Sequence, residues 1–250
     1  MKGNNTKNFI LNFKKSPGPL SDIVLNPEHG GPILCLDANQ DIIITGSTDH
    51  GLRVYNNQSG KQIKELFSKN FGHTEWVTCV KILKNKRVIS GGMDSNICIW
   101  EPTGISCKYI TENTGSISKI LVNDNERILM NGSYDSAIRL FDLTTLQCLS
   151  TLSGIHKGPV SEIEWKNSLC VSGSKDGSIA IWDLNQEKCI KHSKSHGGLV
   201  KTIKFFTGED DINNNFSNLI ITGGSNDGMI NCIDMRTNDA VFSKQVIFLL

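Results

Sequence analysis

Two sets of side chains in this sequence have the composition of a hydrolytic triad. The sets are His73, Ser90 and Asp94, and His156, Ser172 and Asp176. A histidine oriented by a carboxylate can take the proton of a serine hydroxyl and so create a nucleophile. The two sets have nearly the same spacing, however, and an enzyme needs only one such site. The repetition therefore favours a structural role, and we predict no catalytic residue.

Metal binding, redox chemistry and cofactor binding are also disfavoured. Equivalent histidines of neighbouring repeats do not converge on one point, as metal ligands must. The chain has 8 cysteines, with no Cys-x-x-Cys pair, and Cys107, Cys148 and Cys189 follow one another at equal intervals. Such equivalent positions are too far apart for disulfides, so we expect reduced cysteines that pack as small apolar side chains. The sequence has no phosphate-binding loop, dinucleotide fingerprint or zinc signature, and we predict no cofactor.

The triad-like residues recur because the chain contains five repeats. Each repeat has a turn aspartate, followed six residues later by a large apolar or aromatic residue. The pairs are Asp49 and Tyr55, Asp94 and Trp100, Asp135 and Phe141, Asp176 and Trp182, and Asp227 and Ile233. In two repeats the turn is Asp-Gly, a strong hairpin signal. A period near 41 residues is typical of repeat architectures.

Alternating apolar residues around each turn indicate four short strands per repeat. One small sheet cannot bury both of its faces, but radial stacking of such sheets can. We therefore predict an all-β fold, a β-propeller of four-stranded antiparallel blades, with five recognisable units that make it either incomplete or unusually small. The predicted domains are an N-terminal segment at 1–27, with a candidate closing strand, and a propeller at 28–250. The units are expected near 29–67, 73–110, 113–152, 156–192 and 196–250.

The repeats resemble the WD-repeat family from Glu28 to Arg236. The family's opening Gly-His pair is present as Gly72-His73, and its closing Trp-Asp pair as Trp182-Asp183. The resemblance implies a buried hydrogen-bonded tetrad of His, Ser or Thr, Asp and Trp in each unit. Two units have all four residues: His73, Ser90, Asp94 and Trp100, and His156, Ser172, Asp176 and Trp182. Unit three has Asn113 and Asn131 instead of the His and Ser, so we expect it to be weakened.

The resemblance also implies where partners bind, on the rim formed by the loops with the opening His and the turn Asp. Transferred residue by residue, the candidate protein-binding residues are Thr48, Met93, Tyr134 and Lys175, which precede turn aspartates, and Trp76 and Lys201, at the start of first strands. The same rule gives Asn226 in unit five. We expect Trp76, Met93 and Tyr134, on adjoining units, to form one exposed patch, because large apolar side chains at loop tips are typical of binding hot spots.

Composition limits the other function classes. The formal net charge is +1, which predicts no nucleic-acid or membrane partner. The first residues do not resemble a signal peptide, and we expect a cytoplasmic or nuclear location. The predicted function is a non-catalytic scaffold or adaptor that binds other proteins. The alternative is a substrate receptor of a cullin-type ubiquitin ligase, suggested by Asp234-Met235-Arg236. The polar, acidic insertion at 207–218 is expected to be a surface loop or an acidic docking loop.

Overall fold

The computed structural model describes residue 25 and residues 28–68, 70–103, 106–206, 218–237 and 239–246. The candidate strand at 8–13, residues 207–217 of the insertion and the apolar residues 247–250 lie outside these ranges. Units one and two comprise β1 (Ile33–Ala38), β2 (Ile42–Ser47), β3 (Leu52–Asn56), β4 (Gln62–Glu65), β5 (Val77–Ile82), β6 (Val88–Gly92), β7 (Ile97–Trp100) and β8 (Cys107–Ile110). Units three to five comprise β9 (Ile117–Val122), β10 (Ile128–Ser133), β11 (Ile138–Asp142), β12 (Cys148–Leu152), β13 (Val160–Lys166), β14 (Leu169–Ser174), β15 (Ser178–Asp183), β16 (Lys188–Lys194), β17 (Val200–Phe205), β18 (Leu219–Gly224), β19 (Met229–Asp234) and β20 (Asp239–Gln245).

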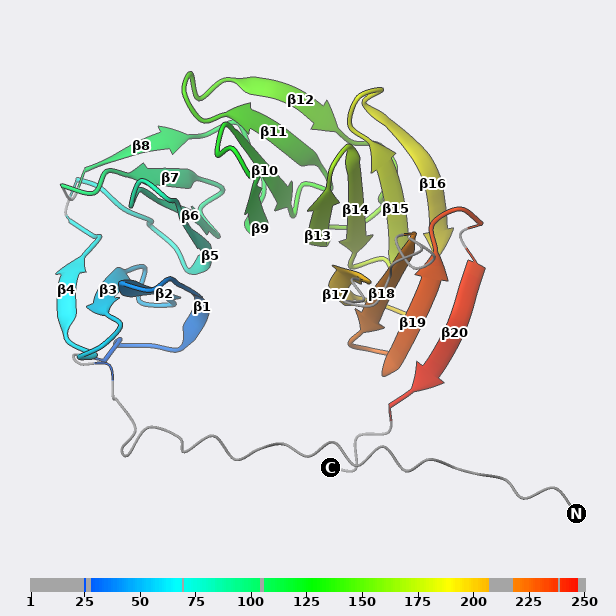
Figure 1. Cartoon of the computed structure of the whole chain (residues 1–250), viewed down its shortest axis with the longest axis horizontal. Coiled ribbons are helices and arrows are strands. Elements are labelled where there is room, and N and C mark those ends of the chain that lie inside the picture. Colours follow the sequence, from blue (N-terminus) through cyan, green and yellow to red (C-terminus); the bar gives the residue numbers. More distant parts are fainter. Residues whose placement is uncertain are drawn as a thin grey trace, which may run out of the picture.

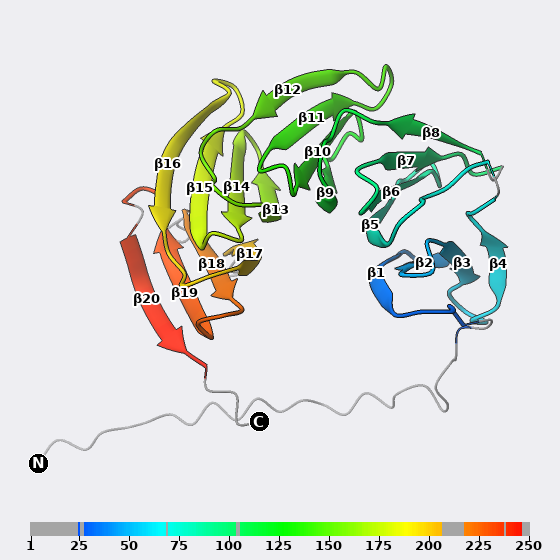
Figure 2. The ribbon, with the colours of Figure 1, turned by 180° about the vertical axis from the view of Figure 1, so that it is seen from behind.

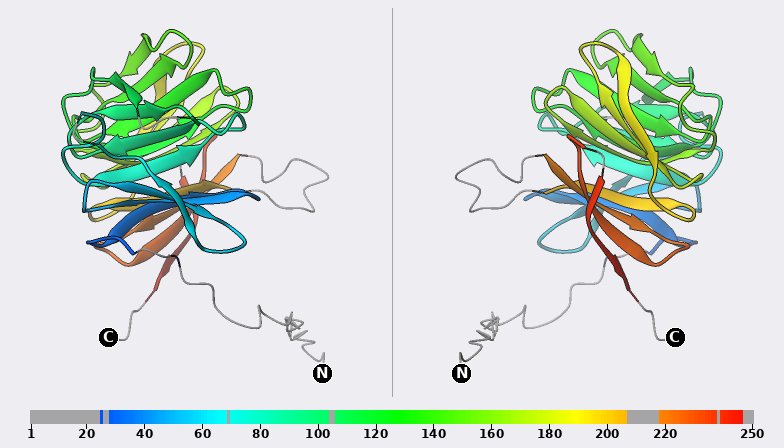
Figure 3. Two further views of the ribbon diagram at one scale, coloured as in Figure 1. Left: turned by 90° about the vertical axis from the view of Figure 1, so that its left-hand side faces the viewer. Right: turned by 90° about the vertical axis from the view of Figure 1, so that its right-hand side faces the viewer.

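The strands form five four-stranded antiparallel sheets, each made of four consecutive strands in chain order. The predicted all-β class and blade composition are thus confirmed, and no helix occurs in the described residues. Figure 1 shows the sheets following one another around an arc, with the first strand of each unit on the inner side and the fourth strand outside; Figure 2 shows the same arc from behind. The outer strands β16 (yellow) and β20 (red) run obliquely to the strands behind them (Figure 3), as the twist of small sheets requires.

The core lies between successive sheets, where one face of a unit packs on the opposite face of the next. Between units one and two, Ile44 and Leu52 pack with Val77 and Trp100. Equivalent buried clusters join units two and three, three and four, and four and five. Neighbouring units are therefore held together by apolar burial, which contributes about 25 cal/mol for each Å² removed from water.

The two end faces of the arc lack this cover. No buried cluster joins unit five to unit one in the described residues. Ile33 is 50% exposed, whereas the residues in its register in the other units are fully buried: Val77, Ile117, Val160 and Val200. On the opposite end face, Ile230 of unit five is 41% exposed. The described units therefore form an open arc.

Each turn aspartate fixes the hairpin between the second and third strands of its unit. Its carboxylate accepts a hydrogen bond from the backbone N–H two residues later, as with Asp94 and Asn96, 3.1 Å apart. The residue between them is left-handed, with φ of 84° at Gly177 and 66° at Ser95. Glycine adopts this conformation without strain, so the Asp-Gly sequence in units four and five suits the turn. These hairpins place the loop tips of all five units on one rim of the arc.

Candidate protein-binding face

A chain of buried polar groups supports this rim from beneath, and unit two has it in full. Asp94 is hydrogen-bonded to His73 Nδ1 at 3.0 Å, and His73 Nε2 lies 2.8 Å from Ser90 Oγ. Trp100 Nε1 donates to the same hydroxyl at 2.9 Å. His73, Ser90 and Trp100 are almost completely buried. Because every polar side-chain group of this four-residue network has a partner, the network stiffens the sheet and fixes the opening loop.

Unit four departs from the expected tetrad. His156 Nε2 lies 2.6 Å from Ser172 Oγ, which also accepts from Trp182 Nε1 at 2.8 Å. His156 Nδ1, however, is bonded to Ser178 Oγ at 2.7 Å rather than to Asp176. Asp176 instead accepts from the backbone N–H groups of Lys157 and Ser178. The predicted direct His–Asp contact is therefore wrong for this unit, because a hydroxyl beside the turn occupies the space between the two side chains.

The remaining units use other residues for the same purpose. In unit one, His29 Nδ1 lies 3.0 Å from Asp49 Oδ1, and His29 Nε2 lies 2.7 Å from Thr45 Oγ1. Unit five has the equivalent trio His196, Asp227 and Thr222.

In unit three, Asn131 Nδ2 donates to Asn113 Oδ1 at 2.9 Å, and Arg139 forms an ion pair with Asp135 at 2.7 Å. An amide pair and a guanidinium thus replace the missing His and Ser only in part, because Asn113 Nδ2 and Asn131 Oδ1 are buried without a hydrogen-bond partner in the described residues.

The turn carboxylates are ionised in the folded chain. Burial by itself raises their pKa, but hydrogen bonds from neighbouring groups lower it further. These bonds come from the backbone of Gly30 and from His29 for Asp49, and from Ser178 for Asp176, and they bring the pKa of each carboxyl to about 2. The pKa values of Asp94, Asp135 and Asp227 are lowered in the same way. The negative charges of the turn aspartates thus interact with hydrogen-bond donors of the rim loops themselves.

The backbone fixes the predicted binding residues at matching places on the rim. In units one to four, the N–H of the residue before the turn Asp donates to the carbonyl at the entrance of the first strand. The pairs are Thr48 and Pro32, Met93 and Trp76, Tyr134 and Ser116, and Lys175 and Pro159. In unit five this bond is made by Ser225 and Leu199, not by Asn226. The prediction of Asn226 is therefore wrong, because the extra residue of this unit lies within the turn, after the equivalent position.

Three large side chains of this rim are exposed, and we call them the rim patch. Trp76 is 44%, Met93 37% and Tyr134 45% exposed. Trp76 and Met93 both belong to unit two, and the Ser116 hydroxyl of unit three donates to the Met93 carbonyl at 3.2 Å. Because Ser116 is also bonded to Tyr134, the three residues lie along one continuous stretch of the rim.

A small cavity of about 220 Å³ lies beside the rim patch, on the inner side of the arc. All five units contribute to its wall, which consists of Leu34, Thr78, Met93, Ser116, Ile117, Ser118, Tyr134, Ser161, Leu199 and Lys201. Lys201 is the single charged residue of that wall. Trp76, Thr48 and Lys175 do not line it, so the structure divides the predicted binding residues between the cavity and the outer rim.

Two hydroxyls at this cavity hold the units together rather than facing a partner. Thr78 Oγ1 donates to the Ile117 carbonyl of unit three, and Ser161 Oγ donates to the Val200 carbonyl of unit five. The sequence rule for binding positions selects both residues but cannot show this second use. The side chains left for a partner are therefore mainly Met93, Tyr134, Leu34 and Lys201.

A metal-binding cluster and a membrane-spanning helix are both absent from the described ranges. No group of three or more His, Cys, Asp or Glu side chains there is arranged to hold a metal ion. All 8 cysteines are free, and each is buried or half-buried. The described part of the chain also contains no helix with the length and apolar character that crossing a membrane requires.

Comparison with known proteins identifies the repeats. The WD domain, G-beta repeat family profile matches residues 23–56, 61–101 and 146–183. The unmatched stretches include most of unit three, which has the asparagine pair, and unit five, where Ile233 stands in place of tryptophan. The matched stretches of the chain are WD repeats.

Curated relatives match parts of the chain. WD repeat-containing protein pop2 of Schizosaccharomyces pombe is 27% identical over 160 residues, which cover 50% of this chain and 22% of pop2. Small ribosomal subunit protein RACK1 of Neurospora crassa is 32% identical over 88 residues, 33% of this chain and 27% of RACK1. COMPASS component SWD3 of Saccharomyces cerevisiae is 31% identical over 123 residues, 48% of this chain and 38% of SWD3. The chain thus spans less than two fifths of each of these relatives.

Solved structures share the fold over most of the chain. The computationally designed Ika8 protein superposes with a TM-score of 0.72 at 21% identity, covering 88% of this chain and 64% of Ika8. U3-55K superposes with a TM-score of 0.75 at 19% identity, covering 89% of this chain and 66% of U3-55K. The shared architecture is the radial array of sheets, and both structures are about half as long again as the region they share with this chain.

Proposed function

We propose that the units at 28–250 act as one non-catalytic module, a scaffold or adaptor that binds a peptide or domain of another protein through the rim patch. WD-repeat proteins generally serve as scaffolds or adaptors in protein interactions, and the likeness to this family supports the proposal. The proposal includes a location in the cytoplasm or the nucleus.

The observation that carries the proposal is the exposure of Trp76, Met93 and Tyr134 on one continuous stretch of a rigid rim. Exposed aromatic and methionine side chains gain free energy when a partner removes them from water, and they are enriched at interface hot spots. The network beneath them holds the loops in place, so little ordering cost remains on binding. The cavity at Met93, Tyr134 and Lys201 is suited to an apolar side chain next to an acidic group of the partner.

Affinity purification with the wild-type chain and with a triple Trp76→Ala, Met93→Ala and Tyr134→Ala variant tests the proposal. We expect partners of the wild type to be lost from the triple variant, and Trp76→Ala alone to weaken binding by about 2 kcal/mol or more. The matched control is Ile63→Ala, Leu149→Ala and Ile190→Ala, which removes three somewhat more exposed apolar side chains from outer strands. If the rim variant retains every partner, or the control loses them equally, the proposal is wrong.

The alternative function, a substrate receptor of a cullin-type ubiquitin ligase, depends on Arg236. The Arg236 guanidinium donates to the Asp234 carboxylate at 2.6 Å, and the arginine side chain is 64% exposed. Because Asp234 belongs to the same chain, this ion pair gives the Arg236 guanidinium a binding partner without a second protein. Adaptor pull-down with and without Arg236→Ala separates this alternative from the scaffold function.

A further inference from the structure

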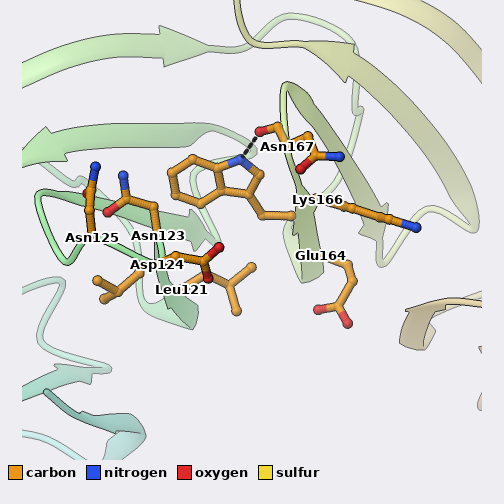
Figure 4. Close-up of a pocket in the computed structure, with 9 residues that line it drawn as sticks. Leu121, Asn123, Asp124, Asn125, Glu164, Lys166 and Asn167 are labelled. Atoms are coloured by element: carbon orange, nitrogen blue, oxygen red, sulfur yellow. Dashed lines mark hydrogen bonds between the residues drawn. The ribbon is translucent and has the colours of Figure 1, made fainter. Parts of the chain in front are cut away.

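A second cavity lies on the opposite rim, between units three and four. It has a volume of about 560 Å³ and is lined by the ends of β9 and β13 and the turns that follow them. The strands β9 and β13 run from the rim patch side to this side, so the cavity is separate from the proposed binding face. Trp165 forms one wall, and its Nε1 donates to the Asn167 carbonyl at 2.7 Å (Figure 4). The size is that of an ordinary ligand pocket.

The equivalent place between units four and five has an aromatic side chain that contacts a cation. Phe205 occupies the place in β17 that Trp165 occupies in β13, because each pairs with the residue two before the buried hydroxyl of the second strand. The Lys166 ammonium of unit four lies over the Phe205 ring, 5.7 Å from its centre. The Phe205 ring is therefore covered by a cation from the chain itself, in a cation–π contact.

Lys166 also borders the groove at Trp165, but its ammonium lies over Phe205, and no cation–π contact to Trp165 occurs within the described residues. The residue of unit three equivalent to Lys166 is Asn123, whose Oδ1 accepts from the backbone of Arg127 and Ile128 in its own turn. The next residue is Asp124, where unit four has Asn167. The Asp124 carboxylate has no ion pair or hydrogen bond within the described residues, and Glu164 is neutralised by Lys204 at 2.5 Å. In Figure 4 the Lys166 side chain extends away from Asp124.

We propose that this groove, formed by Trp165, Asp124 and Asn123, binds an arginine or lysine side chain of a partner protein. The partner's cation takes the role that Lys166 has in the neighbouring groove, against the indole face, and Asp124 supplies the opposite charge. Tryptophan is the strongest of the aromatic side chains for such contacts. The groove thus provides a second docking point for a basic segment, on the rim opposite the rim patch.

The test is an NMR titration of the full chain with acetyl-Gly-Arg-Gly-amide, with the four tryptophan indole N–H signals as the readout and Trp165→Phe for assignment. We expect a saturable shift of the Trp165 signal alone. Asp124→Asn is expected to raise the Kd about threefold to tenfold through loss of the opposite charge. Asn123→Lys, which copies Lys166, is expected to abolish the shift. Lys61→Ala, which removes an exposed lysine of unit one outside the groove, is the matched control and should leave binding unchanged.

Three results would overturn the inference: no saturable shift of Trp165, an equal shift with the uncharged citrulline peptide, or an unchanged Kd for Asp124→Asn. The other three indole signals report whether each variant is folded. Because the rim patch is intact in all these variants, failure here is distinguishable from failure of the proposed function, which is measured by partner capture.

Discussion

Replacing Trp100 by alanine is expected to destabilise the chain by about 3–5 kcal/mol, the usual cost of removing a large buried aromatic side chain. Trp100 is completely buried, packs in the cluster between units one and two, and donates to Ser90. Its removal leaves a cavity. It also removes one hydrogen-bond donor from the Ser90 hydroxyl, which is part of the network with His73 and Asp94. Chemical denaturation measures the loss of unfolding free energy.

Unit five provides the control for this substitution. Ile233 occupies the tryptophan position there and is 2% exposed, which shows that an aliphatic side chain can fill the place. Trp100→Ile is therefore expected to cost clearly less than Trp100→Ala. A loss below about 1 kcal/mol for Trp100→Ala would mean that the residue is not part of a tightly packed interface between the units.

Acidification is expected to destabilise unit four between pH 6.5 and pH 4 through His156. Burial lowers the pKa of His156 from 6.5 to about 4, and nearby His192 contributes in the same direction. In this window the unfolded chain binds a proton at His156 and the folded chain does not, so stability is present above pH 6.5 and is lost as the pH falls. The difference corresponds to about 3 kcal/mol.

His156→Asn separates this effect from the acid titration of the turn carboxylates. It places at this position the residue that unit three has in Asn113. The variant should be less stable at pH 7 but should show a flatter loss from pH 6.5 to 4. Asp49 and Asp176, with pKa values of about 2, act in a lower range, from about pH 4 down to about pH 2. An unchanged slope in His156→Asn would show that His156 is not the group responsible.

The repeats and the strands could be predicted from sequence because they depend on local signals. The turn aspartates, the alternating apolar residues and the Asp-Gly turns each specify a hairpin within a few residues. The contacts of His73 in unit two could also be predicted from the sequence, since all four residues of the tetrad are present.

Contacts that depend on one extra side chain were harder to predict. Ser178 stands between His156 and Asp176, and it is the only hydroxyl among the residues two after the turn aspartates. Arg139 lies four residues after Asp135, close enough across the turn to pair with it. Both signals are visible in the sequence once the turn geometry is known. The Trp165 groove gave no sequence signal, because it forms between two units whose packing the sequence pattern does not measure.

The most direct test of the protein-binding rim is site-specific photo-crosslinking at two positions of unit three. A photoreactive phenylalanine analogue is placed at Tyr134, in the rim patch, or at Leu149, on β12 at the outside of the arc. The natural side chains are 45% and 52% exposed, so exposure alone predicts similar yields. If the rim patch is the binding face, partners crosslink from position 134 and not from position 149. Crosslinks from position 149 alone, or equally from both, would contradict it.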